Sequence, residues 1–225
     1  MSRSGLDSLL AEQIAYYRAR APEYADNAMP EISRAAQDSA ANELRQALAG
    51  FRPRGDVLEL ACGPGTFTSE LAGYADHLTA VDAAPEMIAL AATKPGTDKV
   101  RFIEADLFAW SPDRRYDCVF FAFWLSHVPL ERFASFWSMV RSCLKPSGRV
   151  FFVDDAFRTA DELIEGERSS TIRRTLNDGT AYRAVKVPHT PDGLSRRLDE
   201  LGWRFEIRRT AGPFYYGSGT PERVG

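Results

Sequence analysis

The sequence is poor in the residues that form metal sites and disulfides. Its 225 residues include three cysteines and three histidines. Cys62, Cys118 and Cys143 are far apart and form no C-x-x-C pair, so we expect buried free thiols in a reducing compartment. The histidines are equally scattered and lack ligand spacing, so we predict no metal site.

Long apolar runs and a strong charge of one sign are also missing. No run approaches the roughly 20 apolar residues that span a bilayer, and the first residues lack the apolar segment and cleavage site of a signal peptide. The formal net charge is -3, with acidic and basic residues interleaved. We therefore expect a cytoplasmic protein whose main partner is neither nucleic acid nor a membrane.

No repeat, low-complexity tract or linker rich in glycine, serine or proline divides the chain. Its length fits one α/β domain, and its 44% hydrophobic composition is that of a soluble globular protein. We predict a single domain over residues 1–225. Within it we expect N-terminal helices over 1–50, a ligand-binding core over 51–155, and a third part over 156–225.

Helix and strand patterns alternate along the chain. Apolar spacing predicts helices over 5–24 and 31–49. Strands are then expected at 56–60, 77–81, 100–103, 116–121 and 149–153, with helices ending at 72 and spanning 85–92 and 130–144. Nearly continuous apolar strands alternating with helices are typical of an α/β, doubly wound, mainly parallel sheet covered on both faces.

The pattern after Ala160 is weaker. We expect a polar helical stretch, a strand over 181–187, a helix over 191–201 and a last strand over 203–210.

A glycine-rich turn follows the first strand, in Glu59-Leu-Ala-Cys-Gly63-Pro-Gly65. Glycines let the backbone approach a ligand closely, although such a turn also occurs simply to reverse the chain. A dinucleotide fold requires a third glycine where this chain has Thr68. The turn therefore argues against a nicotinamide dehydrogenase, for which we also find no tyrosine and lysine proton relay.

Carboxylates follow the next two strands. Asp82 and Asp106 are expected at the edge of the sheet where ligands bind, beside the apolar side chains of Met87 and Leu107. Asp82 can accept ribose hydroxyls and Asp106 an adenine amino group, or each can merely cap the helix or turn that follows. Taken together, the three strand ends predict a nucleoside with a compact cationic substituent.

These motifs resemble a known family. The runs 57–65, 80–88 and 104–107 are together similar to the first three motifs of class I S-adenosylmethionine-dependent methyltransferases. The resemblance implies S-adenosylmethionine as cofactor, S-adenosylhomocysteine as product, and a Rossmann-like seven-stranded sheet with its last strand antiparallel. The cofactor-binding residues that we expect are Tyr17, Arg20, Glu59, Ala61, Gly63, Gly65, Asp82, Ala83, Met87, Asp106, Leu107 and Phe123.

Within this family, the chain is similar to phosphonate O-methyltransferases of dehydrophos biosynthesis. The matching stretches are 16–21, 119–129, 173–179 and 185–187. The resemblance implies that His127, Arg174 and Lys186 are catalytic residues on the acceptor side. Glu31 stands in place of an aromatic residue and Phe123 in place of a histidine, which argues against assuming the same phosphonate.

The residue types leave alternatives at each of these positions. His127 follows the fourth strand, where it can orient or deprotonate an acceptor or merely shape the loop. Arg174 and Lys186 suit an anionic oxygen group, although many cations near them are solvated. Tyr17 and Arg20 belong either to an N-terminal helical lid over the site or to a helix packed on the sheet edge.

The favoured function is methyl transfer to a small, anionic acceptor, a phosphonate or carboxylate oxygen. The alternatives are O- or N-methylation of a neutral hydroxyl or amine with His127 as general base, and S-adenosylmethionine binding without catalysis. An RNA methyltransferase is disfavoured by the acidic charge balance. We expect a monomer or a homodimer.

Overall fold

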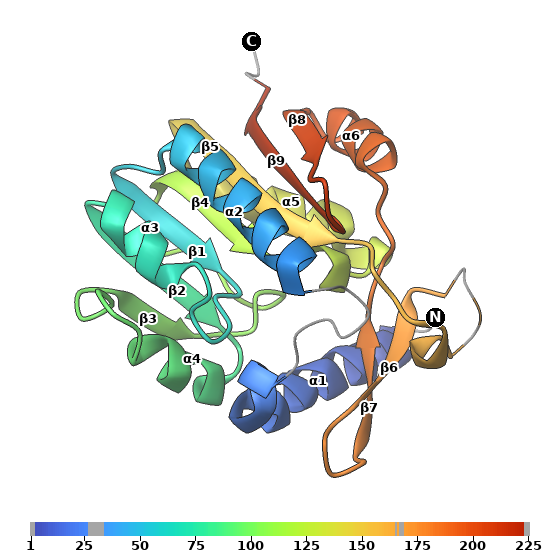
Figure 1. Ribbon diagram of the computed structural model, residues 1–225. Coiled ribbons are helices and arrows are strands. Elements are labelled where there is room, and N and C mark those ends of the chain that lie inside the picture. Colours follow the sequence, from blue (N-terminus) through green and yellow to red (C-terminus); the bar gives the residue numbers. More distant parts are fainter. Residues whose placement is uncertain (1–2, 27–33, 165, 167–168, 223–225) are drawn as a thin grey trace.

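A seven-stranded sheet forms the centre of the protein (Figure 1). The computed structural model describes residues 3–26, 34–164, 166 and 169–222. The strand order is β3-β2-β1-β4-β5-β9-β8. These strands are β1 (Asp56–Leu60), β2 (His77–Asp82), β3 (Arg101–Glu104), β4 (Tyr116–Ala122), β5 (Leu144–Asp155), β8 (Trp203–Arg209) and β9 (Phe214–Pro221).

Strands β1 to β5 pair in parallel, whereas β9 runs antiparallel to both β5 and β8. The expected doubly wound, mainly parallel sheet with an antiparallel last strand is therefore confirmed.

Helices cover both faces of the sheet. Helices α2 (Arg34–Phe51) and α3 (Thr68–Tyr74) cover one face, and α5 (Leu130–Cys143) and α6 (Pro191–Glu200) cover the other. Helix α4 (Pro85–Ala92) packs beside β2 and β3. Side chains alternate along a strand, so that Phe120 and Phe151 enter the first core while Phe121 and Phe152 enter the second.

The chain between β5 and α6 differs from our expectation. The short helix η3 (Ala160–Glu162) is followed by a hairpin of β6 (Thr171–Thr175) and β7 (Ala181–Val185), which is separate from the main sheet. The described part of the expected polar helical stretch is helical only at η3 and contains the strand β6, and the strand expected over 181–187 belongs to the hairpin instead of the main sheet. A turn at Gly179, where φ is +87°, joins the two hairpin strands.

Strand β9, which we did not predict, completes the sheet. It contains Gly217 and Gly219, residues that usually weaken a strand signal. A Cβ at Gly217 would lie 2.6 Å from the Phe152 ring, and one at Gly219 would lie 2.3 Å from the Arg204 carbonyl oxygen. These glycines are required by close packing, which composition alone does not reveal.

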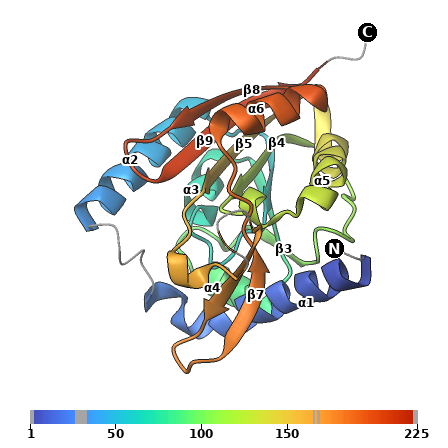
Figure 2. The ribbon, with the colours of Figure 1, turned by 90° about the vertical axis from the view of Figure 1, so that its right-hand side faces the viewer.

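The first helix lies near the carboxyl ends of the parallel strands, beside the hairpin (Figures 1 and 2). The expected helix over 5–24 is α1 (Arg3–Arg20) followed by the 3-10 helix η1 (Ala21–Asp26). Leu6, Leu9 and Leu10 pack against Val185 and Val187 after the hairpin turn. Residues 27–33, and with them Glu31, lie outside the described residues.

Other expectations concern the chain as a whole. All three cysteines are buried free thiols, as expected. None of the described helices is long and apolar enough to cross a membrane.

Candidate active site

A cavity of about 700 Å³ opens where β1, β2 and β4 end. This volume lies within the range of small-ligand sites. Its walls come from these strand ends, from α1 and η1, and from the β6–β7 hairpin with the segment before it. Every residue that we expected in the site lines this cavity except Gly65.

The turn after β1 presents open backbone to the cavity. Ala61 and Gly63 have positive φ angles of 52° and 54°, and a Cβ added at Gly63 would meet nothing within 4 Å. Gly65, with φ +83°, faces α4 instead, where a Cβ would lie 2.9 Å from the Ala91 Cα. Gly63 is therefore the glycine that a ligand can approach, whereas Gly65 lets the turn pack on α4.

Glu59 is a buried carboxyl beneath this turn. Its Oε2 accepts a hydrogen bond of 2.7 Å from the Thr68 hydroxyl. Burial, with a smaller contribution from the charge of Asp82, raises the pKa of Glu59 to about 8. Thr68 stands where a dinucleotide fold has its third glycine. Its hydroxyl instead binds Glu59, a role that we did not predict.

Asp82 joins the β1 turn to the start of α4. Its Oδ2 accepts the Gly63 N–H at 2.8 Å, and its Oδ1 accepts the Ala84 N–H at 2.9 Å. Burial raises the pKa of Asp82, although these backbone donors oppose the shift. Helix α4 begins after Ala84 without a side-chain cap, so Asp82 does not cap it. A carboxylate has about four acceptor positions, so Asp82 can hold the backbone of Gly63 and Ala84 and still accept hydroxyl groups of a ligand.

Asp106 lies at the next strand end, after β3. Its Oδ1 accepts the Phe108 N–H at 2.9 Å, which is the turn-capping arrangement considered above. Its neighbour Leu107 is buried, as is Met87 on α4, and both line the cavity with Ala83. The carboxylates at two strand ends and the apolar surface between them fit a nucleoside.

The aromatic face of α1 and η1 closes this side of the cavity. Arg20 donates to the Tyr16 hydroxyl at 2.9 Å and lies over the rings of Tyr16 and Tyr24. Among the described residues, no carboxylate pairs with Arg20, which lines the cavity. The α1 side chains therefore contribute to the site as well as to packing.

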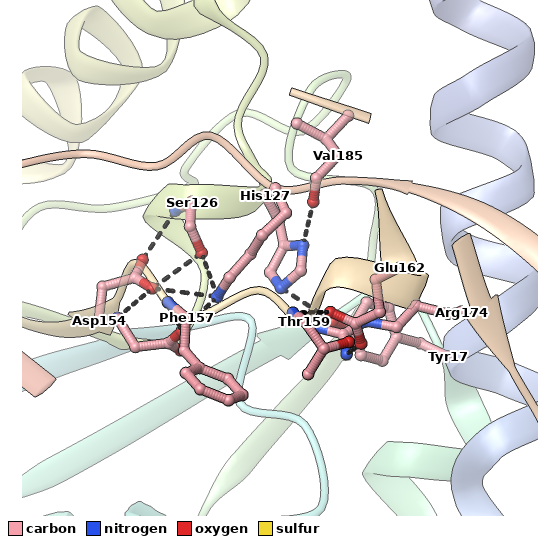
Figure 3. A network of polar contacts seen from close by, with 11 residues as sticks. Tyr17, Ser126, His127, Asp154, Phe157, Thr159, Glu162, Arg174 and Val185 are labelled. Atoms are coloured by element: carbon pink, nitrogen blue, oxygen red, sulfur yellow. Dashed lines mark hydrogen bonds and ion pairs between the residues drawn. The ribbon is translucent and has the colours of Figure 1, made fainter. Parts of the chain in front are cut away.

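His127, in the short helix η2 (Leu125–His127), is held at both ring nitrogens (Figure 3). Nδ1 lies 2.6 Å from the Val185 carbonyl oxygen, which can only accept, so Nδ1 carries the proton. Nε2 then accepts the Tyr17 hydroxyl proton at 3.0 Å. Burial, together with the positive charges of Lys186 and Arg174, lowers the pKa of His127 well below its usual value.

Lys186 is a buried cation within a polar network at the end of β5. Its Nζ lies 2.9 Å from Asp155 Oδ1 and 4.0 Å from Asp154 Oδ1, and it donates to Ser126 Oγ at 3.1 Å. Ser126 in turn donates its N–H and hydroxyl to Asp154 (Figure 3). We missed both aspartates, although their place at a strand end was the signal that identified Asp82 and Asp106.

Arg174, on β6, forms an ion pair with Glu162 of η3 (Figure 3). Both side chains line the cavity, and so does the neighbouring Arg173. We did not predict Glu162, because nothing in its local sequence places it opposite Arg174.

Two further side chains complete this description. Trp124 lines the cavity, and its buried indole N–H finds no acceptor among the described residues. Phe123 also lines the cavity and has a positive φ of 54°, which is rare for a non-glycine residue. In the part of the chain that the structure describes, no group of three His, Cys, Asp or Glu could hold a metal ion.

Comparison with known proteins identifies the family. Residues 57–148 match the methyltransferase domain family. Trans-aconitate 2-methyltransferases of Escherichia coli (strain SE11) and Shigella flexneri are each 34% identical over 94 residues, 41% of this chain. The match spans only 36% of the length of these curated relatives.

Solved structures match over a longer range. The DhpI-SAM-HEP complex is 44% identical with a TM-score of 0.84, covering 95% of this chain and 98% of DhpI. The DhpI-SAH complex is 43% identical with a TM-score of 0.80, covering 95% and 97%. The PH0226 protein of Pyrococcus horikoshii OT3 shares the fold at 23% identity and a TM-score of 0.67, covering 84% of this chain and 92% of that one. The cavity geometry, the family match and this similarity to DhpI together show that the chain belongs to the class I S-adenosylmethionine-dependent methyltransferases.

Proposed function

We propose that the protein methylates an oxygen of a small acceptor that carries a carboxylate or phosphonate group. The observation that carries this proposal is that Arg174 and Lys186 line the same cavity as Asp82 and Asp106. DhpI was solved with HEP as well as with the cofactor, and another relative is named for trans-aconitate, a carboxylate.

The cofactor half of the cavity is formed by strand ends β1 to β3 and by α1. S-adenosylmethionine, when bound, supplies an electrophilic methyl group. Asp82 accepts hydrogen bonds from the ribose hydroxyls, and Asp106 accepts one from the adenine amino group. Arg20 of α1 also lines the cavity, and its guanidinium is suited to the carboxylate of the methionyl part.

The acceptor half is formed by η2, η3 and the hairpin. Arg174 binds the anionic group, and Lys186 holds its network of aspartates and Ser126 in place beneath it. A carboxylate oxygen is already ionised at neutral pH, so the protein needs no strong base for it. Catalysis then depends on alignment and on the exclusion of water, to which α1 and the hairpin contribute by covering the cavity.

A second candidate function is methylation of a neutral hydroxyl or amine. One observation favours it: His127 is neutral, and its Nε2 carries a lone pair toward Tyr17. In this case His127 Nε2 accepts the acceptor's proton after Tyr17 has moved aside.

Two variants separate the candidates. With an anionic acceptor, Arg174→Ala should raise the acceptor KM about 10- to 100-fold, the usual effect of losing a charged hydrogen bond, while His127→Ala changes turnover much less. Acceptor-dependent release of S-adenosylhomocysteine measures both. A collapse of kcat confined to the histidine variant would support the neutral acceptor and overturn the anionic one.

The matched control is Arg208→Ala, which removes an exposed arginine paired with Glu206 on β8, away from the cavity. Calorimetry with S-adenosylmethionine tests the cofactor half separately. Cofactor binding without methylation of any acceptor would leave only a binding protein.

A further inference from the structure

The acceptor half of the cavity contains an acidic side chain in a fixed place. Glu162 accepts a hydrogen bond from Arg174 through Oε1 and the Thr159 N–H through Oε2, the latter at 3.2 Å. The Thr159 side chain accepts the Glu162 N–H in return, so the two residues form a capping box. The Glu162 carboxylate, whose side chain is 16% exposed, is therefore held from two sides at the cavity wall.

The two cations that we assign to the acceptor half, Arg174 and Lys186, already have acidic partners. Lys186 lies between Asp155 and Asp154, and Arg174 lies against Glu162. A bare anion bound at Arg174 would lie close to the Glu162 carboxylate, and like charges at such a distance repel. The site is thus bipolar, with a guanidinium and a carboxylate side by side.

Resting on the proposed function, we infer that the preferred acceptor is zwitterionic. Its carboxylate or phosphonate binds Arg174, and an ammonium group elsewhere in the same small molecule binds Glu162. A guanidinium has five N–H donors and a carboxylate about four acceptor positions, so each can bind the acceptor without leaving its partner. The chemical class is that of small amino acids and aminoalkyl phosphonates, and Glu162 is the residue that selects it.

Pairs of acceptors that differ in one group provide the test. One pair is 2-aminoethylphosphonate and 2-hydroxyethylphosphonate, and the other is β-alanine and propionate. For the wild-type protein, kcat/KM should be about 10-fold or more higher for each amine, because a charge-assisted hydrogen bond to Glu162 is gained. Calorimetry in the presence of S-adenosylhomocysteine should show the same preference in binding.

Glu162→Gln should abolish the preference. Glutamine keeps the capping box but removes the negative charge. The kcat/KM for 2-aminoethylphosphonate and β-alanine should therefore fall about 10-fold, whereas that for 2-hydroxyethylphosphonate and propionate should stay the same or rise. Glu206→Gln is the matched control, because it also removes the acidic partner of an arginine, but on the exposed surface of β8.

The outcomes are separable from failure of the proposed function. If wild-type protein methylates or binds both members of each pair equally, or prefers the member without an amine, the inference falls and the proposed function stands. If S-adenosylhomocysteine binds but no acceptor of either pair is bound or methylated, both fall. If Glu162→Gln does not bind S-adenosylhomocysteine, the wild-type comparison alone decides.

Discussion

At the scale of single residues, Glu59 is a buried carboxyl group between strand β1 and helix α3, where it accepts a hydrogen bond from Thr68. In the folded protein burial raises its pKa from the usual 4.5 to about 8, so the carboxyl is neutral at pH 7. In the unfolded chain it ionises near its usual value. The folded state therefore binds one more proton than the unfolded state between these two pH values.

This difference predicts a pH-dependent stability. The contribution of Glu59 is fully present below pH 4.5 and is lost as the pH rises through about 8. Relative to Glu59→Gln, which cannot ionise, the wild-type free energy of unfolding should fall by about 1.4 kcal/mol per pH unit within this window. Urea denaturation of both proteins at pH 5, 7 and 9 measures it, and parallel pH dependences would contradict the assignment.

The imidazole of His127 offers a second prediction. Because its pKa is well below the usual value, its ring protons should show no titration between about pH 6 and 8 by NMR. Tyr17→Phe removes the hydroxyl that donates to Nε2 and stabilises the neutral ring. The pKa of His127 should therefore rise in this variant. An unchanged or lower value would show that the Tyr17 contact does not favour the neutral form.

Part of the site could be predicted from the rule that ligands bind at the carboxyl ends of parallel strands. Asp82 ends β2 and Asp106 follows β3, so their positions at the cavity could be predicted from the order of the strands along the chain. Asp155 ends β5 and obeys the same rule, but its partner Lys186 lies 31 residues further along the chain, so the local sequence does not show their pairing. Glu162 could not have been found, since its position opposite Arg174 depends on a tertiary contact between η3 and β6.

At the scale of secondary-structure elements, side chains of α1 form hydrogen bonds with the backbone of hairpin strand β7. Gln13 Oε1 accepts the Val185 N–H at 2.9 Å, and Gln13 Nε2 donates to the His127 carbonyl at 3.4 Å. Glu12 likewise accepts the Arg183 N–H at 2.6 Å. The helix thus completes the hydrogen bonds of an edge strand that would otherwise face solvent.

Removing Gln13 should loosen this contact. Gln13→Ala leaves a buried backbone N–H without its acceptor, and such a group costs about 1–3 kcal/mol. Hydrogen exchange at the Val185 amide should accelerate, whereas strands β1 and β4 should be unaffected. Glu12→Gln keeps an oxygen acceptor and is the control; equal protection of Val185 in both variants would argue against the bridge.

Elements buried on both faces were the easiest to predict. Strands β1, β2 and β4 and the second half of β5 are largely buried apolar runs, which leave few alternatives. The short hairpin strands β6 and β7 contain charged residues and have no clear apolar pattern, and β7 packs on α1 rather than in the main sheet. Their local sequence therefore did not reveal this partner. Strand β9 was not predicted because it contains glycines, which are uncommon in strands. These glycines are explained only by the close contact of β9 with β5 and β8.

At the scale of the whole molecule, strands β8 and β9 tie the C-terminal part of the described chain to the main sheet through β5. Because β9 pairs with β5 and β8 pairs with β9, unfolding the C-terminal part would remove this edge of the sheet and expose β5 and the core beside it. We therefore expect a single cooperative unfolding transition by calorimetry, in accord with a single domain. Two separated transitions would contradict it.

Cofactor binding should raise the temperature of that transition. S-adenosylhomocysteine at 100 times its Kd should stabilise the fold by about 2.7 kcal/mol, or roughly 5–10 °C in Tm for a chain of this size. Asp82→Asn should lose most of this shift. An equal shift in wild type and variant would exclude Asp82 from the cofactor site.

The two halves of the cavity come from different stretches of the chain. Helix α1 and the strand ends between Glu59 and Leu107 form one half, whereas η3, β6 and Lys186 form most of the other. If the proposed function holds, we expect mutations in residues 159–186 to change which molecule receives the methyl group more than they change cofactor binding. Such a division leaves the protein open to new acceptors over evolution, and a chimera carrying this segment from a relative should inherit that relative's acceptor.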